Sequence, residues 1–317
     1  MADGATDYHQ SARHRRQSWY GTKALVKRLL AQPGIHVAVR GGAAILGHRI
    51  DRARLPAPAR LRHVTARMSG VTFVMLHPDR CIVAKELYWG GGRRPRAEDQ
   101  FGLDVFAVLA RDARLVLDVG AYTGVFSLLA ARVAPRAQVH AFEVVPEVAA
   151  AARENVAANG LSGRVTVHAA GVGEQGSTVT VASGSGGSAL PDFYSTRLHF
   201  AGGEQVDVRS LDAIVTKIDL PPPALVKIDV EGTEDVVLAH AQSFLASHQP
   251  DILCEILLAS NTAAVQAALG PHGYRLYRVE RHALNPQSQL APSPEFRDWL
   301  FTSKSSAELT ARGIPVA

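Results

Sequence analysis

The chain has 317 residues, 47% of them hydrophobic, which is enough for one large core or for one domain with an appendage. Its two cysteines argue against a disulfide framework or a cysteine-rich metal site, and no uninterrupted apolar run is long enough to span a membrane. The net charge of +5 divides into +10 for residues 1–67 and −5 for residues 68–317. We therefore expect a cytoplasmic protein without a membrane span, in which a basic arm precedes an acidic body, and no nucleic-acid partner.

The N-terminal arm, residues 1–67, is predicted to be partly helical. An amphipathic stripe over residues 18–31 predicts one helix that stops near Pro33, and a weaker helical pattern covers residues 37–54. Packing on the core, a homodimer contact through these helices, and binding of an acidic partner or a membrane surface are the alternatives for this arm.

Residues 68–97 are predicted to form a β-hairpin and a flexible loop. Residues 71–76 and 81–84 are the expected strands, because both are apolar and a turn-forming stretch separates them. The glycines at 90–92 are suited either to a hinge for a flap over a ligand or to an ordinary surface turn.

The segment 115–128 is predicted to be a buried strand, a glycine turn and an apolar helix. Its pattern, Asp118-x-Gly120-x-x-x-Gly124, lacks the second glycine of the dinucleotide-binding fingerprint and the lysine of a phosphate-binding loop. Glycine lets a ligand approach the backbone closely. Asp118 suits a cation such as the α-amino group of an amino-acid-like cofactor, whereas it would repel a pyrophosphate.

The next predicted strand, 138–143, ends in a second acid. Glu143 lies 25 positions after Asp118, close to the spacing at which a doubly wound fold places a ribose-binding carboxylate. Ala170 and Gly171 follow the strand after that and are expected to flank an adenine ring.

Less specific patterns cover other parts of the chain. The Gly- and Ser-rich stretch 183–188 is predicted to be a mobile loop, with Ser188 as a candidate ligand contact. Residues 205–208 are predicted to form an edge strand. Residues 274–279 and 299–303 are expected to be the last two strands, separated by a proline-rich loop.

Two more acids lie on or next to strands in the C-terminal half. Asp229 is placed where its strand ends, on the same side as Lys227, at the edge where open α/β sheets bind ligands. The helix dipole explains Glu234 well and Glu231 in part. Glu255 interrupts an apolar strand, and an unpaired buried carboxylate is costly, so it should find a cation, a proton or a metal. A structural ion pair between Lys227 and Glu255 is the alternative.

Over residues 98–303 the sequence resembles the FkbM family of methyltransferases. The resemblance is carried by Leu117-Asp-Val-Gly-Ala-x-x-Gly124, Ala141-Phe-Glu143-x-x-Pro146, Val226-Lys-Ile-Asp-Val-Glu-Gly-x-Glu234 and Pro250-x-Ile-Leu-x-Glu255. The third motif is the most specific, because the first alone indicates only a class I methyltransferase. The resemblance implies an α/β fold with a doubly wound, mostly parallel sheet of seven strands. The arm and the hairpin precede this domain, and a tail, 304–317, follows it.

The resemblance also implies that S-adenosylmethionine is the cofactor. Glu98 is included because the helix before the glycine turn is expected to pack over the methionine end of the cofactor. Tyr122 stands where the family often has Asn, and Gly171 replaces a usual Ala, so the pocket wall is altered. The expected cofactor contacts are Glu98, Asp118, Gly120, Tyr122, Gly124, Glu143, Val144, Ala170, Gly171 and Asp229.

The family usually methylates hydroxyl groups of sugars or natural products, so a small-molecule hydroxyl acceptor is expected. Because a protonated hydroxyl is a poor nucleophile, we expect Asp229, Glu255 and Lys227 to be catalytic. Asp229 and Glu255 either hold a divalent cation such as Mg²⁺ or supply the general base directly. Methylation of a carboxylate or amine is one alternative, and a non-catalytic binding protein on the same fold is another, although the acids at the motif positions argue against the latter.

Overall fold

The computed structural model describes residues 29–32, 35, 37–39, 41, 55–181 and 203–317. Most of the predicted N-terminal helices, and the loop that contains Ser188, lie outside the described residues. Within the described part of the chain, no helix has both the length and the apolar character needed to cross a membrane.

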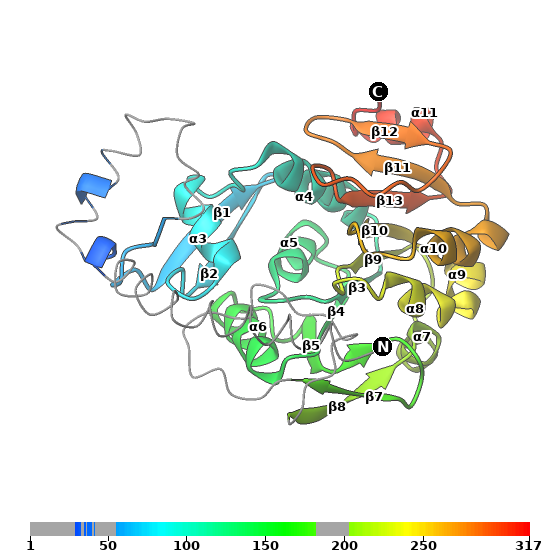
Figure 1. The fold of residues 1–317 in the computed structure, drawn as a ribbon, viewed down its shortest axis with the longest axis horizontal. Coiled ribbons are helices and arrows are strands. Elements are labelled where there is room, and N and C mark those ends of the chain that lie inside the picture. Colours follow the sequence, from blue (N-terminus) through cyan, green and yellow to red (C-terminus); the bar gives the residue numbers. More distant parts are fainter. Residues whose placement is uncertain (1–28, 33–34, 36, 40, 42–54, 182–202) are drawn as a thin grey trace, which may run out of the picture.

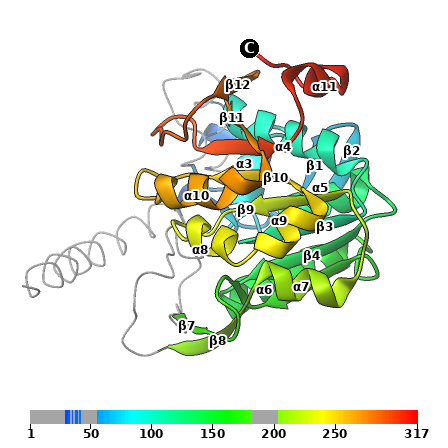
Figure 2. The ribbon, with the colours of Figure 1, turned by 90° about the vertical axis from the view of Figure 1, so that its right-hand side faces the viewer.

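One sheet runs through the middle of the molecule, with helices on both faces (Figure 1, Figure 2). In the described chain this sheet has eight strands. Five adjacent strands run parallel to one another, and the remaining three, at one edge, pair with their neighbours in the antiparallel direction. This arrangement confirms the predicted doubly wound α/β fold. The strands in spatial order are β12 (Leu284–Gln287), β11 (Arg275–Val279), β13 (Asp298–Thr302), β10 (Asp251–Glu255), β9 (Ala224–Ile228), β3 (Leu115–Val119), β4 (Gln138–Glu143) and β5 (Val165–Ala169).

The number of strands differs from the expected seven, because β12 lies in the proline-rich stretch that was predicted to be a loop. Leu284 is fully buried and pairs with Val279, which fixes the start of the strand. Pro286 lies opposite Tyr277. The strand is at the edge of the sheet, where a residue without an N–H is tolerated.

The central parallel strands β3 and β9 are buried on both sides, so their sequences are mostly apolar rather than alternating. All five residues of β3 and all five of β9 are buried. Val116 and Leu225 belong to the core under one helical layer, whereas Leu117 and Val226 belong to the core on the opposite face. The helices are α4 (Ala97–Ala110), α5 (Val125–Val133) and α6 (Pro146–Ala158) on the first face, and α7 (Leu211–Ile218), α8 (Glu234–Ala239), α9 (Gln242–His248) and α10 (Thr262–Leu269) on the second.

A hairpin is present, but it pairs residues 71–76 with the strand before them and not, as predicted, with residues 81–84. β1 (His63–Met68) pairs antiparallel with β2 (Val71–Leu76) through a two-residue turn with positive φ at both positions. The residues predicted as the second strand form the helix α3 (Ile82–Trp89) instead. The helix begins there because the Cys81 side chain caps it, accepting a hydrogen bond from the N–H of Ala84 at 3.3 Å.

The glycines after α3 form a turn that is packed on β1. The N–H of Arg67 donates to the carbonyl of Gly92 at 2.8 Å, and a Cβ on Gly92 would lie 2.8 Å from the carbonyl oxygen of Thr65. These contacts favour the surface turn over the hinge.

A small second sheet follows β5, the strand at one edge of the main sheet. It consists of β6 (Gly171–Val172), β8 (Glu204–Arg209) and β7 (Thr178–Val181) in that order. The segment predicted as an edge strand is therefore the central strand, because β6 pairs with it on one side and β7 on the other.

The C-terminal residues pack on the main sheet. Two short helical elements complete the described chain, η3 (Gly270–His272) after α10 and α11 (Ser306–Ala311) after β13. Val316 forms a parallel bridge with Leu284 of β12, so the predicted tail is joined to the edge of the sheet.

Candidate active site

A cavity of about 680 Å³ lies at the carboxyl ends of β3, β4, β9 and β10. Open α/β sheets bind ligands at this edge. Nine of the predicted site residues line it, and they are Gly120, Tyr122, Glu143, Val144, Ala170, Gly171, Lys227, Asp229 and Glu255. Among the described residues, Glu98, Asp118 and Gly124 stand outside this lining.

The glycine turn is fixed by the approach of two strand ends. A Cβ on Gly120, whose φ is +76°, would lie 1.8 Å from the carbonyl oxygen of Asp229. Glycine is therefore required here by the packing of β3 against the end of β9, and not only by the approach of a ligand. Gly124 has a φ of +87° and is the N-cap residue of α5.

Asp118 turns toward the helix that follows it. Its Oδ2 accepts hydrogen bonds from the backbone N–H of Ser127 at 3.0 Å and from the Ser127 hydroxyl at 2.6 Å. Burial raises the pKa of this carboxyl to about 6, with the bonds from Ser127 opposing the rise. The structure thus places Asp118 as a buried link between β3 and α5.

Glu143 faces the cavity from the end of β4. Its Oε2 accepts from the N–H of Tyr122 and its Oε1 from the N–H of Val145, each at 2.9 Å. Burial raises its pKa to about 7, while the two N–H bonds oppose the rise. A carboxylate has about four acceptor positions, so two remain for a ligand.

The wall beside Glu143 is apolar. Val144 and Ala170 line it, together with Gly171 at the start of β6. A Cβ on Gly171 would lie 3.0 Å from a methyl group of Val208. An alanine at this position would therefore need the Val208 side chain of the adjacent strand β8 to shift slightly.

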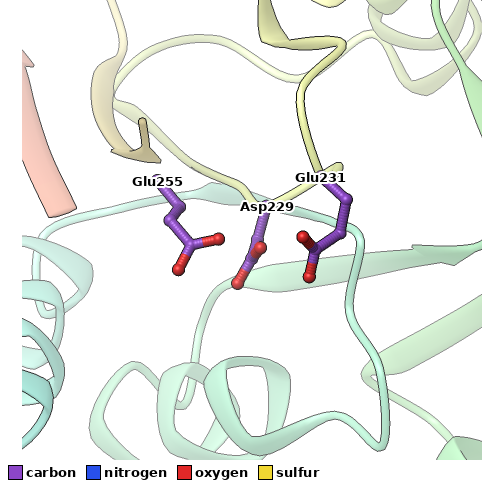
Figure 3. A group of neighbouring side chains, drawn as sticks. All are labelled: Asp229, Glu231 and Glu255. Atoms are coloured by element: carbon purple, nitrogen blue, oxygen red, sulfur yellow. The ribbon is translucent and has the colours of Figure 1, made fainter. Parts of the chain in front are cut away.

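Three carboxyl groups meet at the ends of β9 and β10, and we call Asp229, Glu231 and Glu255 the acid group. Figure 3 shows them side by side, and one oxygen from each lies within 4.8 Å of the others. The Lys227 Nζ lies 3.7 Å from Asp229 Oδ2, and Nη1 of Arg297 lies 3.1 Å from Glu255 Oε1.

Lys227 pairs with acids other than Glu255, the partner in the structural alternative considered for it. The Lys227 Nζ instead lies 3.3 Å from Oδ1 of Asp298, at the start of β13. β13 inserts next to β10 and brings Asp298 opposite Glu255 in the antiparallel register. Burial lowers the pKa of Lys227, but the charges of Asp298 and Asp229 outweigh it and raise the pKa overall.

The acid group contains two carboxyls with raised pKa values. Burial is the largest cause for Glu255, followed by the charges of Asp229 and Asp298. Burial and the charge of Asp229 raise the pKa of Glu231 to about 7. Raised acidic pKa values in a cavity mark a candidate site of proton transfer.

A sequence profile described as the Methyltransferase FkbM domain matches residues 118–299, which is more than half of the chain. The chain belongs to the FkbM methyltransferase family. Among curated proteins, none matches the sequence.

Several solved methyltransferases are similar to this FkbM chain. The FkbM methyltransferase of Methylobacillus flagellatus KT is 17% identical with a TM-score of 0.41, over 69% of this chain and 51% of that one. This chain thus spans about half the length of that protein. An O-methyltransferase from Bacillus cereus, in complex with SAH, is 15% identical with a TM-score of 0.36, over 63% and 78%. A SAM-dependent O-methyltransferase from Thermotoga maritima is 12% identical with a TM-score of 0.37, over 76% and 78%.

Some cavity residues of this FkbM chain had no role in the sequence prediction. Asp99 lines the cavity where its neighbour Glu98 was expected, and Arg94 lies beside it. Glu231, for which the sequence suggested only a partial role in the helix dipole, precedes α8 and has a φ of +54°. Asp298 begins β13, and Arg297 directly precedes it. The only signal for Arg297 and Asp298 in the sequence was that two adjacent charged residues come before an apolar stretch. That signal does not show which part of the fold they face.

Proposed function

We propose that the protein is an S-adenosylmethionine-dependent O-methyltransferase that acts on a hydroxyl group of a sugar or of a glycosylated or polyketide-type small molecule. The observation that carries the proposal is that Glu143 and the acid group line one cavity, at the ends of different strands. Methyl transfer to a hydroxyl needs a cofactor site and a proton acceptor within the same cavity.

The residues of the cavity fit the cofactor. Glu143 has acceptor positions for the two ribose hydroxyls, in addition to those used by Tyr122 and Val145. Val144 and Ala170 offer apolar surface for an adenine ring. When bound, S-adenosylmethionine supplies a methyl group on a positively charged sulfur.

The geometry of the acid group supports a role in receiving the proton of the acceptor hydroxyl. Asp229 lies at the end of β9 with the ammonium of Lys227 beside it, and Asp298 holds that ammonium from the other side. Burial and the charges of Asp229 and Asp298 raise the pKa of Glu255, so this carboxyl holds its own proton more tightly than an exposed glutamate does. Asp229 is therefore the proposed acceptor of the proton, Glu255 lies beside it as an acid, and Lys227 acts by holding Asp229.

Direct proton transfer is favoured over a Mg²⁺ site at these residues. Two members of the acid group already have a cationic partner, Lys227 for Asp229 and Arg297 for Glu255. Positive charges this close to the carboxylates oppose the binding of a divalent cation. We therefore expect binding and turnover to be unaffected by a chelator.

Calorimetric titration with S-adenosylhomocysteine tests the cofactor site. Wild-type protein is expected to bind it, with and without a chelator, and Glu143→Ala and Glu143→Gln are expected to bind at least about tenfold more weakly. Glu147→Gln, an exposed position at the start of α6, is the matched control and should bind like the wild type. Folded wild-type protein that does not bind would overturn the proposal.

A screen of hydroxylated acceptors, read by mass spectrometry, tests the second half of the proposal. The expected product is a methyl ether, which is stable to mild base. A methyl ester, which mild base cleaves, would identify a carboxylate acceptor instead.

A further inference from the structure

An ion pair lines the cavity away from Glu143, and its residues precede the part of the chain that matches the family profile. Arg94 Nη2 lies 2.9 Å from Oδ2 of Asp99, and both residues line the cavity. The same nitrogen lies 2.7 Å from Oε2 of Glu86, on α3. The side chains of Arg94 and Asp99 are 17% and 22% exposed, so the pair is partly open to the cavity.

The Arg94 side chain is held in place but not fully used. Its backbone N–H donates to Gln100 Oε1 at 2.9 Å, which ties the segment to the first turn of α4. A guanidinium carries five N–H donors in a planar fork. Within the described chain, both ion pairs of Arg94 use Nη2, and its Nε is a buried donor without an acceptor. A fixed guanidinium with uncommitted N–H groups is suited to a carboxylate.

The position of this pair complements that of Glu143. Glu143 and Ala170 belong to the side of the cavity formed by β4 and β5. Asp99 lies in the first turn of α4, which packs on α5 and also contacts β10 and β11 on the other side of β3. The glycine turn after β3 lies between these two sides of the cavity. A ligand whose ribose is held by Glu143 can therefore reach the positive charge of Arg94 and the negative charge of Asp99 beyond the turn.

We propose that Arg94 and Asp99 bind the amino-acid end of the cofactor, Arg94 its α-carboxylate and Asp99 its α-ammonium. This inference rests on the proposed function. An α-amino acid group carries one charge of each sign, and a neighbouring arginine and aspartate present one partner for each. The amino-acid group adds no net charge to the site, and each of its two charges meets an opposite charge, so neither is buried without a partner.

The other cations of the described cavity wall are less suited to this role. The side chain of Lys227 is only 3% exposed, compared with 17% for Arg94, and it is enclosed by Asp298, Asp229 and the carbonyl of its neighbour Ile228. Arg297 pairs with Glu255 in the acid group, at the place proposed for the acceptor hydroxyl. Arg297→Gln is therefore the informative alternative variant, because it removes a cavity cation from the acceptor side.

The test compares two ligands by calorimetric titration. S-adenosylhomocysteine carries the amino-acid end, and 5′-methylthioadenosine lacks it while keeping the adenosine. In Arg94→Gln the affinity for S-adenosylhomocysteine is expected to fall about 10- to 100-fold, as for a lost charge-assisted hydrogen bond, whereas the affinity for 5′-methylthioadenosine stays unchanged. Asp99→Asn is expected to weaken the same ligand selectively, and Arg93→Gln, which removes an exposed arginine paired with Asp104, is expected to change neither affinity.

A third ligand on unmodified protein makes the test independent of the stability of the variants. Decarboxylated S-adenosylhomocysteine should bind the wild type about tenfold or more weakly than the parent compound. Equal binding of the two overturns the proposal, and so does a selective loss in Arg297→Gln with none in Arg94→Gln. If the wild type binds neither S-adenosylhomocysteine nor 5′-methylthioadenosine, the proposed function itself fails. If the wild type binds both and Arg94→Gln leaves the ratio of the two affinities unchanged, only the role of Arg94 fails.

Discussion

The backbone N–H of Tyr122 donates a 2.9 Å hydrogen bond to Oε2 of Glu143, across the ends of β3 and β4. Tyr122 has a φ of +50°, in the left-handed region that residues other than glycine rarely occupy. The carboxylate that we propose to bind the ribose therefore also holds the glycine turn in place. Ligand affinity and the geometry of the turn depend on the same group.

The raised pKa of Glu143 makes cofactor binding depend on pH. With a pKa of about 7, the carboxyl is mostly protonated at pH 6 and mostly ionised at pH 8. Ribose hydroxyls donate better to the ionised form, so the affinity for S-adenosylhomocysteine should rise with pH over this range, by up to about tenfold. Titrations at pH 6, 7 and 8 with the wild type and with Glu143→Gln measure the effect. Ionisation of the ligand appears in both proteins, so an equal pH dependence in the two would contradict the role of Glu143.

Gly120 is expected to be far less tolerant of substitution than another glycine with a similar backbone. In Gly120→Ala the new Cβ would meet the carbonyl oxygen of Asp229, which lies at 1.8 Å, and β3 and β9 would have to separate. In Gly160→Ala, where φ is +66° and no described atom lies within 4 Å of the Cβ, only the backbone strain of about 1–2 kcal/mol remains. Urea unfolding should give a loss for Gly120→Ala that exceeds the loss for Gly160→Ala by about 2 kcal/mol or more. Similar losses would show that the strand ends can move apart easily.

Glu231 combines a strained backbone with a place in the acid group, so its replacement by glycine should increase stability and reduce activity. Left-handed backbone costs a non-glycine residue about 1–2 kcal/mol, and glycine loses about 0.5–1 kcal/mol more chain entropy on folding. Glu231→Gly should therefore raise the free energy of unfolding by about 0.5–1 kcal/mol. Glu231→Gln keeps the strain and removes the charge, which separates the two causes. A glycine variant less stable than the glutamine variant would speak against stored strain.

The sequence located the features of the site that depend on neighbouring residues along the chain. Glu143 and Asp229 were found because an apolar run identifies a strand and the next residue lies at its end. The orientation of Asp118 was not predictable in the same way, because it depends on Ser127 in the following helix. Asp298 reaches Lys227 only because β13 inserts between β10 and β11, which is a property of the topology.

The error at the hairpin has a similar cause. Residues 81–84 are apolar enough for a strand, and the cap that decides for a helix is a cysteine, which is not one of the usual N-cap residues. The contact between Arg94 and Asp99 joins the segment after α3 to the start of α4, so it required both helix boundaries to be known.

The last prediction separates proton transfer from cofactor binding at the acid group. Asp229→Asn keeps the size of the side chain and removes its ability to take a proton, so turnover should fall by about 10²- to 10⁴-fold. The affinity for S-adenosylhomocysteine should stay within about threefold of the wild type, since the carboxylates of Glu143 and Asp99 are untouched. Glu255→Gln should also reduce turnover. Asp207→Asn, at an exposed position on β8, is the matched control.

Single-turnover rates and calorimetric titrations on the same preparations make this comparison. A fall in turnover without a fall in affinity supports a proton acceptor at Asp229. A parallel fall in both would make Asp229 a cofactor-binding residue. Unchanged turnover in both Asp229→Asn and Glu255→Gln would remove the need for a base, and together with a base-labile product it would indicate a carboxylate acceptor, because a carboxylate attacks the methyl group without losing a proton.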